Sequence, residues 1–283
     1  MLPIHVALVA EESKITTGEL VEVAAALQKQ VTRDFAPIWG VVCDVTTFPA
    51  LEKMPLDYWP IIVRDDIAID AEGVHEDAQG QPFALVKYDD SWPLMASHEA
   101  LEMLADPFGR RLVAGDSVVE NQGRVLYLVE VCDPCEAGSF AYSINGVTVS
   151  DFYTPNFFDP VTAAGVRYSF NNSLTQPRQV AKGGYLTWFV PATGQWWQRT
   201  WFGAGPIDGP IAKFETRNGN LRTSIDRTTA KYRKRAMSTA RSIAGARETG
   251  GMGGEAPAFR KRAAALRAAI REVLGVREIL GVR

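Results

Sequence analysis

Residues 4–35 read IHVALVAEESKITTGELVEVAAALQKQVTRDF, and this stretch decides the class of fold. Apolar side chains alternate at its start, as in a β-strand: Ile4, Val6 and Leu8. Between residues 17 and 35 the apolar positions recur at helical spacing, and Thr16 or Thr17 is a typical helix N-cap. The chain therefore opens with a strand followed by a helix.

The same patterns continue along the chain. Extended runs are predicted at residues 38–45, 60–64 and 82–88, and a helix is predicted over 95–105, ended by Asp106-Pro107. Further strands are expected at 124–131, 140–144 and 185–190, with Asn145-Gly146 as a hairpin turn. These elements predict an α/β (α+β) fold built on a twisted mixed sheet.

Composition limits the class of protein. The 283 residues are 46% hydrophobic and 22% charged, which is typical of a water-soluble globular chain. No apolar run approaches the roughly 18–20 residues of a membrane span, so no membrane association is expected. The first ten residues lack a basic leader, which favours a cytoplasmic location over secretion. Three cysteines are too few for a disulfide framework.

Charge divides the chain into two parts. Residues 211–283 contain 17 Lys or Arg against 6 Asp or Glu, and residues 1–210 contain 13 against 27. We therefore expect a domain over 1–210 and a basic C-terminal arm over 211–283, with Ala/Arg-rich helices at 226–248 and 256–280 and a Gly-rich hinge at 250–254. Such an arm can bind a polyanion or a protein partner, or it can dock on the acidic body of the same chain.

The strongest chemical signal lies in the helix predicted over 95–105. His98 and Glu102 are four residues apart, so both project from one face of a helix and can hold the same ion. Imidazole nitrogen and carboxylate oxygen are both zinc ligands. Glu99 lies beside them, where it could act as general base towards a metal-activated water. The segment has the pattern of a zinc-protease helix in which glutamate replaces the second histidine.

A third ligand is expected from the acidic segment 130–136. Asp133, at a strand end before Pro134, is one candidate and Glu130 is the other. Asp106 and Asp151 are candidates for carboxylates that orient His98 or an arginine, although either could simply cap a helix or a turn.

Other interpretations of these residues are less specific. A match of this length arises by chance in acidic helices, where His98 would pack and the glutamates would be solvated. Cys132 and Cys135 have the spacing of a redox pair, but no helix is expected behind them to lower the thiol pKa. His75 lies in a predicted loop, where a lone histidine is usually solvated.

The run from Ala96 to Pro107, followed by residues 129–133, resembles a family of bacterial zincin-like metallopeptidases. Those proteins pair an S-H-E-x-x-E helix ending in Asp-Pro with a downstream E-x-x-D segment. The similarity covers roughly residues 1–205. It implies a zincin-like fold with His98 and Glu102 as metal ligands, Glu99 as the base, and Asp133 or Glu130 in the same site. The chain departs from better-understood zincins because it lacks a second histidine in the motif.

Two functional hypotheses follow from the sequence. The first is a zinc-dependent peptidase that hydrolyses peptide or protein substrates, with the strand over 83–88 as the sheet edge that holds an extended substrate. The second is a catalytically inactive structural or binding protein, for example a component of a phage assembly. In that case the site would hold a structural ion such as calcium, and the basic arm would contact the partner.

Overall fold

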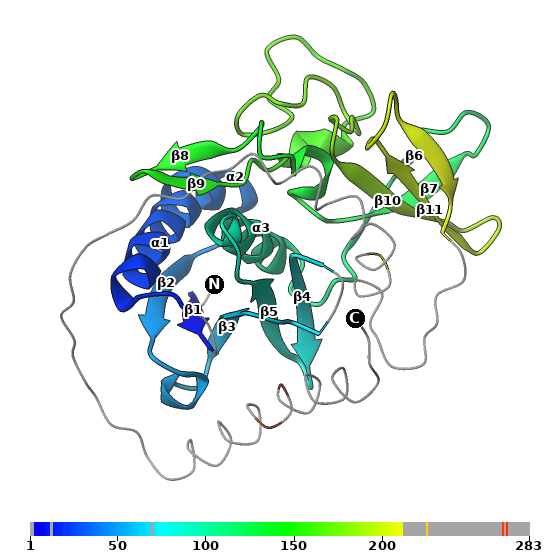
Figure 1. The fold of residues 1–283 in the computed structure, drawn as a ribbon. Coiled ribbons are helices and arrows are strands. Elements are labelled where there is room, and N and C mark those ends of the chain that lie inside the picture. The colour runs from blue at the N-terminus through cyan, green and yellow to red at the C-terminus, as the bar shows by residue number, and fades with distance from the viewer. Residues whose placement is uncertain are drawn as a thin grey trace.

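The computed structural model describes residues 3–11, 14–68 and 71–211, together with the single residues 225, 268 and 270. Two five-stranded sheets and two long helices make up most of the described chain (Figure 1). The expected mixed α+β class is confirmed at this level. Apart from residues 268 and 270, the helices predicted over 226–248 and 256–280, and the hinge at 250–254, lie outside the described residues.

The first sheet has the order β2-β1-β3-β5-β4. Its strands are β1 (Ile4–Ala10), β2 (Cys43–Phe48), β3 (Tyr58–Arg64), β4 (Gly73–Ala78) and β5 (Gln81–Lys87). All neighbours are parallel except β4, which runs antiparallel to β5. Gln79 and Gly80 connect these two strands with positive φ angles of 52° and 81°, as a two-residue hairpin turn requires.

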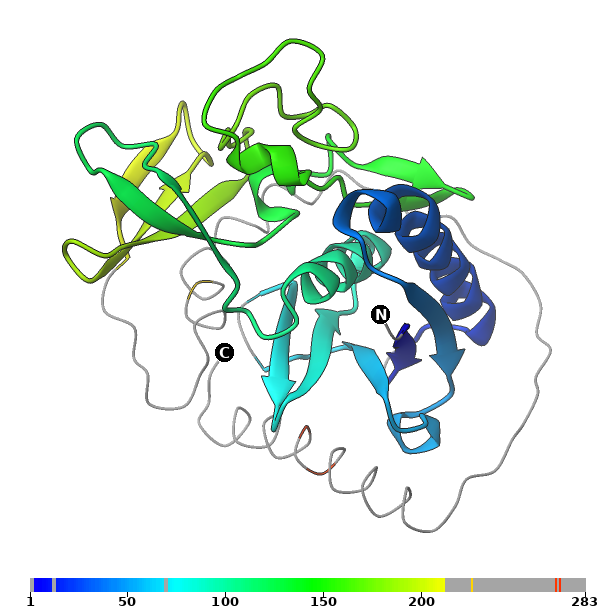
Figure 2. The same cartoon turned by 180° about the vertical axis from the view of Figure 1, so that it is seen from behind.

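Both long helices cover one face of the first sheet (Figure 2). They are α1 (Thr17–Lys29) and α3 (Trp92–Ala105). The side chain of Thr16 caps α1 by accepting a hydrogen bond from the backbone N–H of Glu19 at 3.2 Å, as predicted. The apolar faces of α1 and α3 form one core with the sheet residues that point towards the helices, which include Val6, Leu8 and Val63.

The opposite face of the first sheet carries a smaller core. It contains Ala7, Val9, Ile62, Phe83 and Leu85. Leu51 of the short 3₁₀ helix η2 (Leu51–Lys53) packs there, and so does Ile270 of the C-terminal segment. Ile270, which belongs to the basic segment 211–283, is thus buried against the body of the protein.

The second sheet is antiparallel and has the order β12-β11-β10-β7-β6. Its strands are β6 (Leu112–Asp116), β7 (Arg124–Leu128), β10 (Tyr185–Val190), β11 (Gln195–Thr200) and β12 (Ile207–Pro210). Trp188 faces Trp197 across β10 and β11, and both belong to the main core or pack against it. Ile225 is buried against Leu128 and Tyr185 of this sheet.

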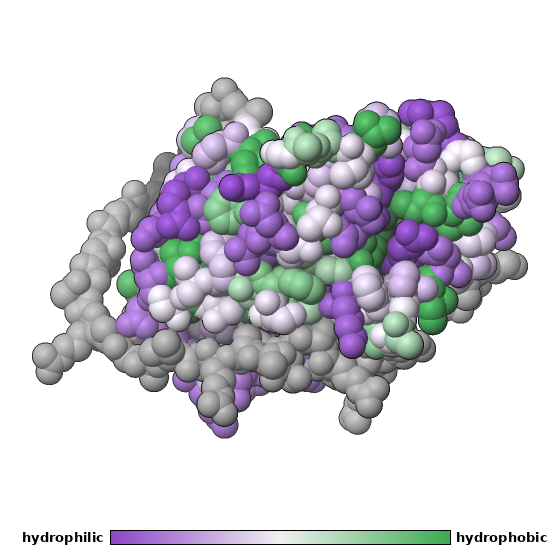
Figure 3. All heavy atoms as spheres, turned by 90° about the horizontal axis from the view of Figure 1, so that it is seen from above, coloured by the Kyte–Doolittle hydropathy of each residue, from purple (hydrophilic) through white to green (hydrophobic). Residues whose placement is uncertain are grey.

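A small ribbon and three short helices complete the fold. The ribbon consists of β8 (Tyr142–Ile144) and β9 (Val147–Val149), joined by the predicted Asn145-Gly146 turn, and it packs on α1 and α3. The short helices are α2 (Ala36–Trp39), η3 (Asp133–Cys135) and η4 (Pro155–Phe158). Seen from above, hydrophilic and hydrophobic side chains are interspersed over the surface (Figure 3).

Three sequence predictions about the first sheet were wrong. The strand expected over 38–45 begins only at Cys43. The residues before it are helical, because α1 continues through a π-helix (η1, Gln30–Phe35) into α2. Helix α2 ends at Gly40, which has a left-handed backbone conformation. Residues 73–78 form a strand and not a loop. Consequently β5 is an inner strand, and β4 lies at that edge of the sheet in place of the expected strand over 83–88.

Candidate metal centre

Helix α3 presents His98, Glu99 and Glu102 inside the protein. All of its residues are buried, because the first sheet lies on one side and β9 on another. His98 and Glu102 are one helical turn apart, and His98 Nε2 lies 3.3 Å from Glu102 Oε1. The spacing expected from the sequence therefore places both side chains on one face.

A buried hydrogen-bond network fixes the start of this motif. The Ser97 hydroxyl donates to Gln30 Oε1 at 2.8 Å and accepts from the backbone N–H of Ser150 at 2.9 Å. Gln30 Nε2 in turn donates to the carbonyl of Ser150 at 2.9 Å. The network joins η1, α3 and the segment after β9, so the helix that carries His98 is held on two sides.

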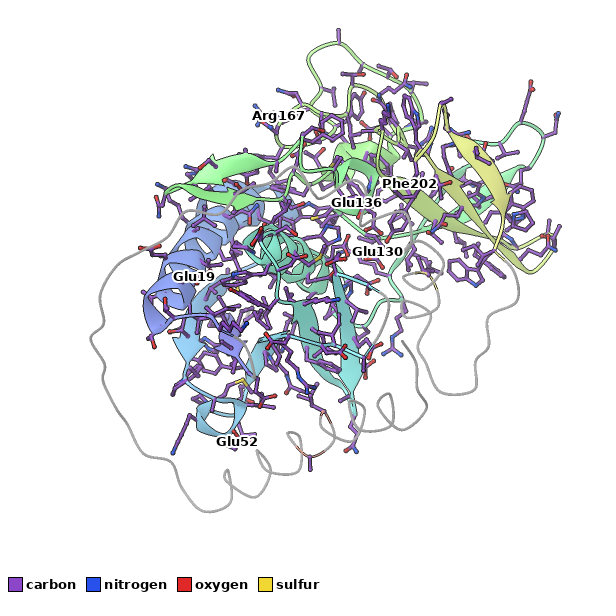
Figure 4. All side chains as sticks on the ribbon, in the orientation of Figure 1. Glu19, Glu52, Glu130, Glu136, Arg167 and Phe202 are labelled. Carbon is purple, nitrogen blue, oxygen red and sulfur yellow. The ribbon has the colours of Figure 1, made fainter. Side chains whose placement is uncertain are left out.

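The segment after β7 brings three acidic side chains to α3. Asp133 Oδ1 lies 3.3 Å from His98 Nε2. Glu130 and Glu136 come from the same turn and lie between α3 and the second sheet (Figure 4). Gly184 allows this turn to approach, because a Cβ atom at Gly184 would lie 2.5 Å from the carbonyl oxygen of Asp133 and 2.7 Å from that of Pro134.

The ligand atoms converge in several groups of three, each within 4.8 Å. One group joins Glu102, Glu130 and Asp133, and a second joins His98, Asp133 and Glu136. Both Glu130 and Asp133, the alternatives left open by the sequence, thus lie at the same place as His98 and Glu102. Glu136, which belongs to the acidic segment 130–136 from which a ligand was expected, joins them.

His75 is a further member of this site, although a solvated loop position was expected for it. It lies on β4 with no exposed surface, and its Nδ1 is 3.5 Å from Glu99 Oε2 and 3.8 Å from Glu102 Oε2. Its Nε2 is 3.0 Å from the carbonyl oxygen of Asp106, which can only accept, so Nε2 carries a proton. The Gln79-Gly80 hairpin signal could have revealed β4 and hence the position of His75.

Glycine at position 73 brings β4 close to α3. A Cβ atom there would lie 2.7 Å from Glu99 Oε1 and 2.6 Å from the side chain of Met95. The carboxyl group of Glu99 therefore lies against β4, next to His75.

The two cysteines near the centre are buried thiols. Burial raises the pKa of Cys132 and of Cys135 well above the ordinary value, and neighbouring carboxylates act in the same direction. A redox pair needs a lowered thiol pKa, so these cysteines do not have the properties of one. Cys132 Sγ forms a ligand group with His98 and Glu102.

Asp106 and Asp151 act as caps of turns. Asp106 Oδ2 accepts a hydrogen bond from the backbone N–H of Arg111 at 2.6 Å. Asp151 Oδ1 accepts from the backbone N–H groups of Phe152 and Asn171, both at 2.8 Å. The sequence left two roles open for these residues, orienting His98 or an arginine and capping a helix or a turn. Their contacts are those of a cap. Burial raises the pKa of Asp151, opposed by its hydrogen bonds.

We call the whole group the acidic centre: His75, His98, Glu99, Glu102, Glu130, Asp133 and Glu136. Each of these residues is at most 4% exposed. Five carboxyl groups held together without solvent are costly as carboxylates unless protons or cations compensate their charge. Carboxylate oxygen with imidazole nitrogen is a donor set that zinc accepts, whereas calcium prefers oxygen alone.

A buried phenol supports the fit of a ligand at this centre. The hydroxyl of Tyr153 is buried, and its proton has no acceptor among the described residues. The charges of Glu130, Glu102 and Asp133 all act on its pKa, so the hydroxyl lies in the field of the acidic centre. An unsatisfied donor beside a set of metal-ligating atoms fits a bound group better than it fits a packed core.

No helix of the described chain has the length and apolarity needed to cross a membrane. Comparisons of the chain with protein-family models, with curated proteins and with solved structures find no match.

Proposed function

We propose that the protein is a zinc-dependent peptidase. The observation that carries this proposal is the convergence of His98, Glu102 and Asp133, with 3.3 Å from His98 Nε2 to each carboxylate. The resemblance to zincin-like metallopeptidases belongs to the same proposal, and so does a cytoplasmic location. The three cysteines are all free and buried, which suits a reducing compartment.

His98, Glu102 and Asp133 would hold the ion, and Glu130 and Glu136 lie within reach as further oxygen donors. When bound, zinc polarises a scissile carbonyl and makes water a nucleophile near neutral pH. Residues of the chain would then move the proton of the attacking water and position the substrate.

Glu99 is the residue placed to move the proton. It follows His98 on α3, and its Oε2 lies 3.5 Å from His75 Nδ1. Its carboxylate would accept a proton from water as the water oxygen bonds to the carbonyl carbon. It would then return the proton to the leaving nitrogen as the C–N bond breaks, so that a carboxylic acid and an amine form.

Strand β4 supports a peptide as the substrate. It carries His75 and packs on α3. It is the edge strand of the described sheet, with β5 as its neighbour. An extended peptide can add to such an edge by main-chain hydrogen bonds, with its scissile bond near Glu99. This assigns to β4 the role that the sequence had suggested for residues 83–88.

A structural metal site is the second candidate. The observation that favours it is burial, since every residue of the acidic centre is at most 4% exposed. A structural ion is usually enclosed by its ligands, whereas a catalytic ion keeps an open position. The protein would then act as a binding or assembly component, and the basic arm over 211–283 would contact a polyanion or a protein partner.

The test measures zinc and peptide hydrolysis in the same samples. The full chain, Glu99→Gln and the control Glu120→Gln are purified, their zinc is measured by inductively coupled plasma mass spectrometry, and cleavage of a quenched fluorescent peptide library is followed. Glu120 is exposed between β6 and β7, so its change should leave both readings intact. We expect about one zinc per chain in all three proteins. We also expect a fall in rate of about 10²- to 10⁴-fold in Glu99→Gln alone.

Each alternative gives a different result. Zinc in the wild type without cleavage of any peptide would favour the structural site. An unchanged rate in Glu99→Gln would remove Glu99 from the mechanism. Absence of zinc from the wild type after loading would overturn the peptidase and a structural zinc site alike.

A further inference from the structure

His75 is a buried side chain of the acidic centre to which the proposed peptide hydrolysis assigns no step. It has no exposed surface, and its Nδ1 lies 3.5 Å from Glu99 Oε2 and 3.8 Å from Glu102 Oε2. One ligand atom from each of these three residues lies within 4.8 Å of the other two. This group of three is distinct from the set His98, Glu102 and Asp133, with which it shares only Glu102.

The ring of His75 is oriented as the ring of a metal-binding histidine usually is. Its Nε2 donates to the backbone carbonyl of Asp106 at 3.0 Å, which lies outside the group of three. Histidines that bind metals almost always donate their second ring N–H in this way, because the bond fixes the ring and leaves the other nitrogen for the ion. The backbone of His75 is held by the pairing of β4 with β5, opposite Ala84. Nδ1 therefore presents its lone pair to Glu99 and Glu102.

The distances from Nδ1 fit an ion better than they fit a hydrogen bond. An N–H···O hydrogen bond spans about 2.7–3.2 Å, and both distances are longer. Two ligand atoms of a tetrahedral zinc ion, each about 2.0–2.2 Å from the metal, lie about 3.3–3.6 Å apart. The 3.5 Å to Glu99 falls in this range, and the 3.8 Å to Glu102 slightly exceeds it. The two 3.3 Å distances from His98 Nε2 fit more closely, so an ion beside His75 should bind more weakly than an ion beside His98.

Glu102 turns a different oxygen to each group. Its Oε1 lies 3.3 Å from His98 Nε2, and its Oε2 lies 3.8 Å from His75 Nδ1. One carboxylate can therefore contribute an oxygen to each of two ions. The acidic centre also has the charge for two ions, since its five carboxyl groups exceed the four positive charges that two divalent cations supply.

We propose that His75, Glu99 and Glu102 form a second zinc site, and that an ion bound there inhibits the peptidase. The site rests on the distances around His75, whereas its inhibitory effect rests on the proposed function. A carboxylate of Glu99 that is bound to zinc no longer accepts the proton of the attacking water. The ligand class is a divalent transition metal that accepts nitrogen and oxygen donors. The protein would thus be active at low zinc concentration and inhibited at high zinc concentration.

The test titrates zinc into the metal-free full chain. Calorimetry counts the binding events and measures each Kd, and cleavage of a quenched fluorescent peptide is followed at one equivalent of zinc and in excess. His75→Gln and Glu99→Gln each remove one ligand of the second site, because an amide is not among the usual zinc ligands. His5→Gln is the matched control, since His5 is part-exposed and contacts Asp44 on β2. The melting temperature of each metal-free chain shows whether it is folded.

We expect two binding events in the wild type and in His5→Gln, the second weaker than the first. His75→Gln and Glu99→Gln should keep the first event and lose the second. At a free zinc concentration about ten times the second Kd, the wild type should cleave about tenfold more slowly than at one equivalent, because only about one chain in eleven keeps the second site empty. The midpoint of this inhibition should equal the second Kd, and His75→Gln should cleave equally fast under both conditions.

A single binding event in a wild type that cleaves the peptide would overturn this inference alone. The same holds for a second event that persists in both variants, and for inhibition by excess zinc that persists in His75→Gln. Two events without cleavage of any peptide would support the second site and overturn its inhibitory effect together with the proposed function. Absence of any binding event would overturn the inference and the proposed function alike. If His75→Gln does not fold, the number of events in Glu99→Gln decides on the second site.

Discussion

The Nε2 atom of His98 lies 3.3 Å from the Oδ1 atom of Asp133, although the two residues belong to different layers of the fold. His98 comes from α3, which packs on the first sheet, and Asp133 begins η3, which packs against β10 of the second sheet. An ion held between them would join the two sheets. Metal binding should therefore contribute to the stability of the folded chain.

This relationship predicts the effect of removing ligands. His98→Ala, Glu102→Ala and Asp133→Ala should each lose zinc, which the wild type should bind at about one ion per chain. At a zinc concentration of about 100 times Kd, the wild type should gain about 2.7 kcal/mol of unfolding free energy, and the variants should gain almost none. Mass spectrometry of the metal and urea denaturation with and without zinc measure both effects.

His5→Ala is the control for this experiment, because His5 contacts Asp44 on β2 and is part-exposed. It should bind zinc like the wild type. If the three ligand variants hold as much zinc as His5→Ala, the acidic centre is not the metal site.

A second prediction concerns Gly184. A Cβ atom there would meet the backbone oxygens of Asp133 and Pro134 at 2.5 and 2.7 Å, and backbone cannot move aside as the end of a side chain can. Gly184→Ala should therefore cost about 1–3 kcal/mol of unfolding free energy. Because the same atoms position Asp133, zinc affinity should fall as well, which calorimetric titration with zinc would measure.

Gly203→Ala is the matched control, since a Cβ atom at Gly203 meets nothing within 4 Å and its backbone is not left-handed. Equal stability and equal zinc affinity in the two variants would show that η3 tolerates displacement.

The local pattern of the sequence predicted the elements that depend on short-range signals. The N-cap at Thr16, the Asn145-Gly146 turn and strand β10 all agree with the structure. Apolar spacing and turn residues suffice for these elements, because the interactions that form them lie within a few residues.

The sequence could not predict which strand lies at the edge of the first sheet. The order β3-β5-β4 depends on long-range pairing, and the polar residues of β4 made it resemble a loop. The same limit applies to the site. His98 and Glu102 are found from helical spacing, but His75 reaches the centre through the packing of β4 on α3, of which the local sequence records only the Gln79-Gly80 turn.

A third prediction tests the network that positions α3. Ser97→Ala removes the hydroxyl that donates to Gln30 and accepts from the backbone N–H of Ser150, and it leaves buried polar groups without their partner. The loss of unfolding free energy should be about 1–3 kcal/mol. Chemical denaturation measures it beside Ser143→Ala, an exposed serine of β8 that should change stability little. A loss no larger than that of the control would mean that the network does not support the helix.

The last prediction concerns the pH dependence of stability. Burial raises the pKa of Asp151 above 3.8, so the folded chain holds this proton more tightly than the unfolded chain does. Its contribution to stability is fully present below pH 3.8 and is lost as the pH rises through the raised pKa. Asp151→Asn carries no titratable proton, and its amide oxygen can still accept from the N–H groups of Phe152 and Asn171.

The unfolding free energy of Asp151→Asn, minus that of the wild type, should therefore increase from pH 4 to pH 7, by about 1.4 kcal/mol for each unit by which the pKa is raised. Urea denaturation across this range measures it, with Asp90→Asn, a change of an exposed carboxyl group, as the control. A difference that decreases with pH would mean that the hydrogen bonds to Asp151 outweigh its burial. The Asp151 carboxylate would then stabilise the turn that leads into Tyr153.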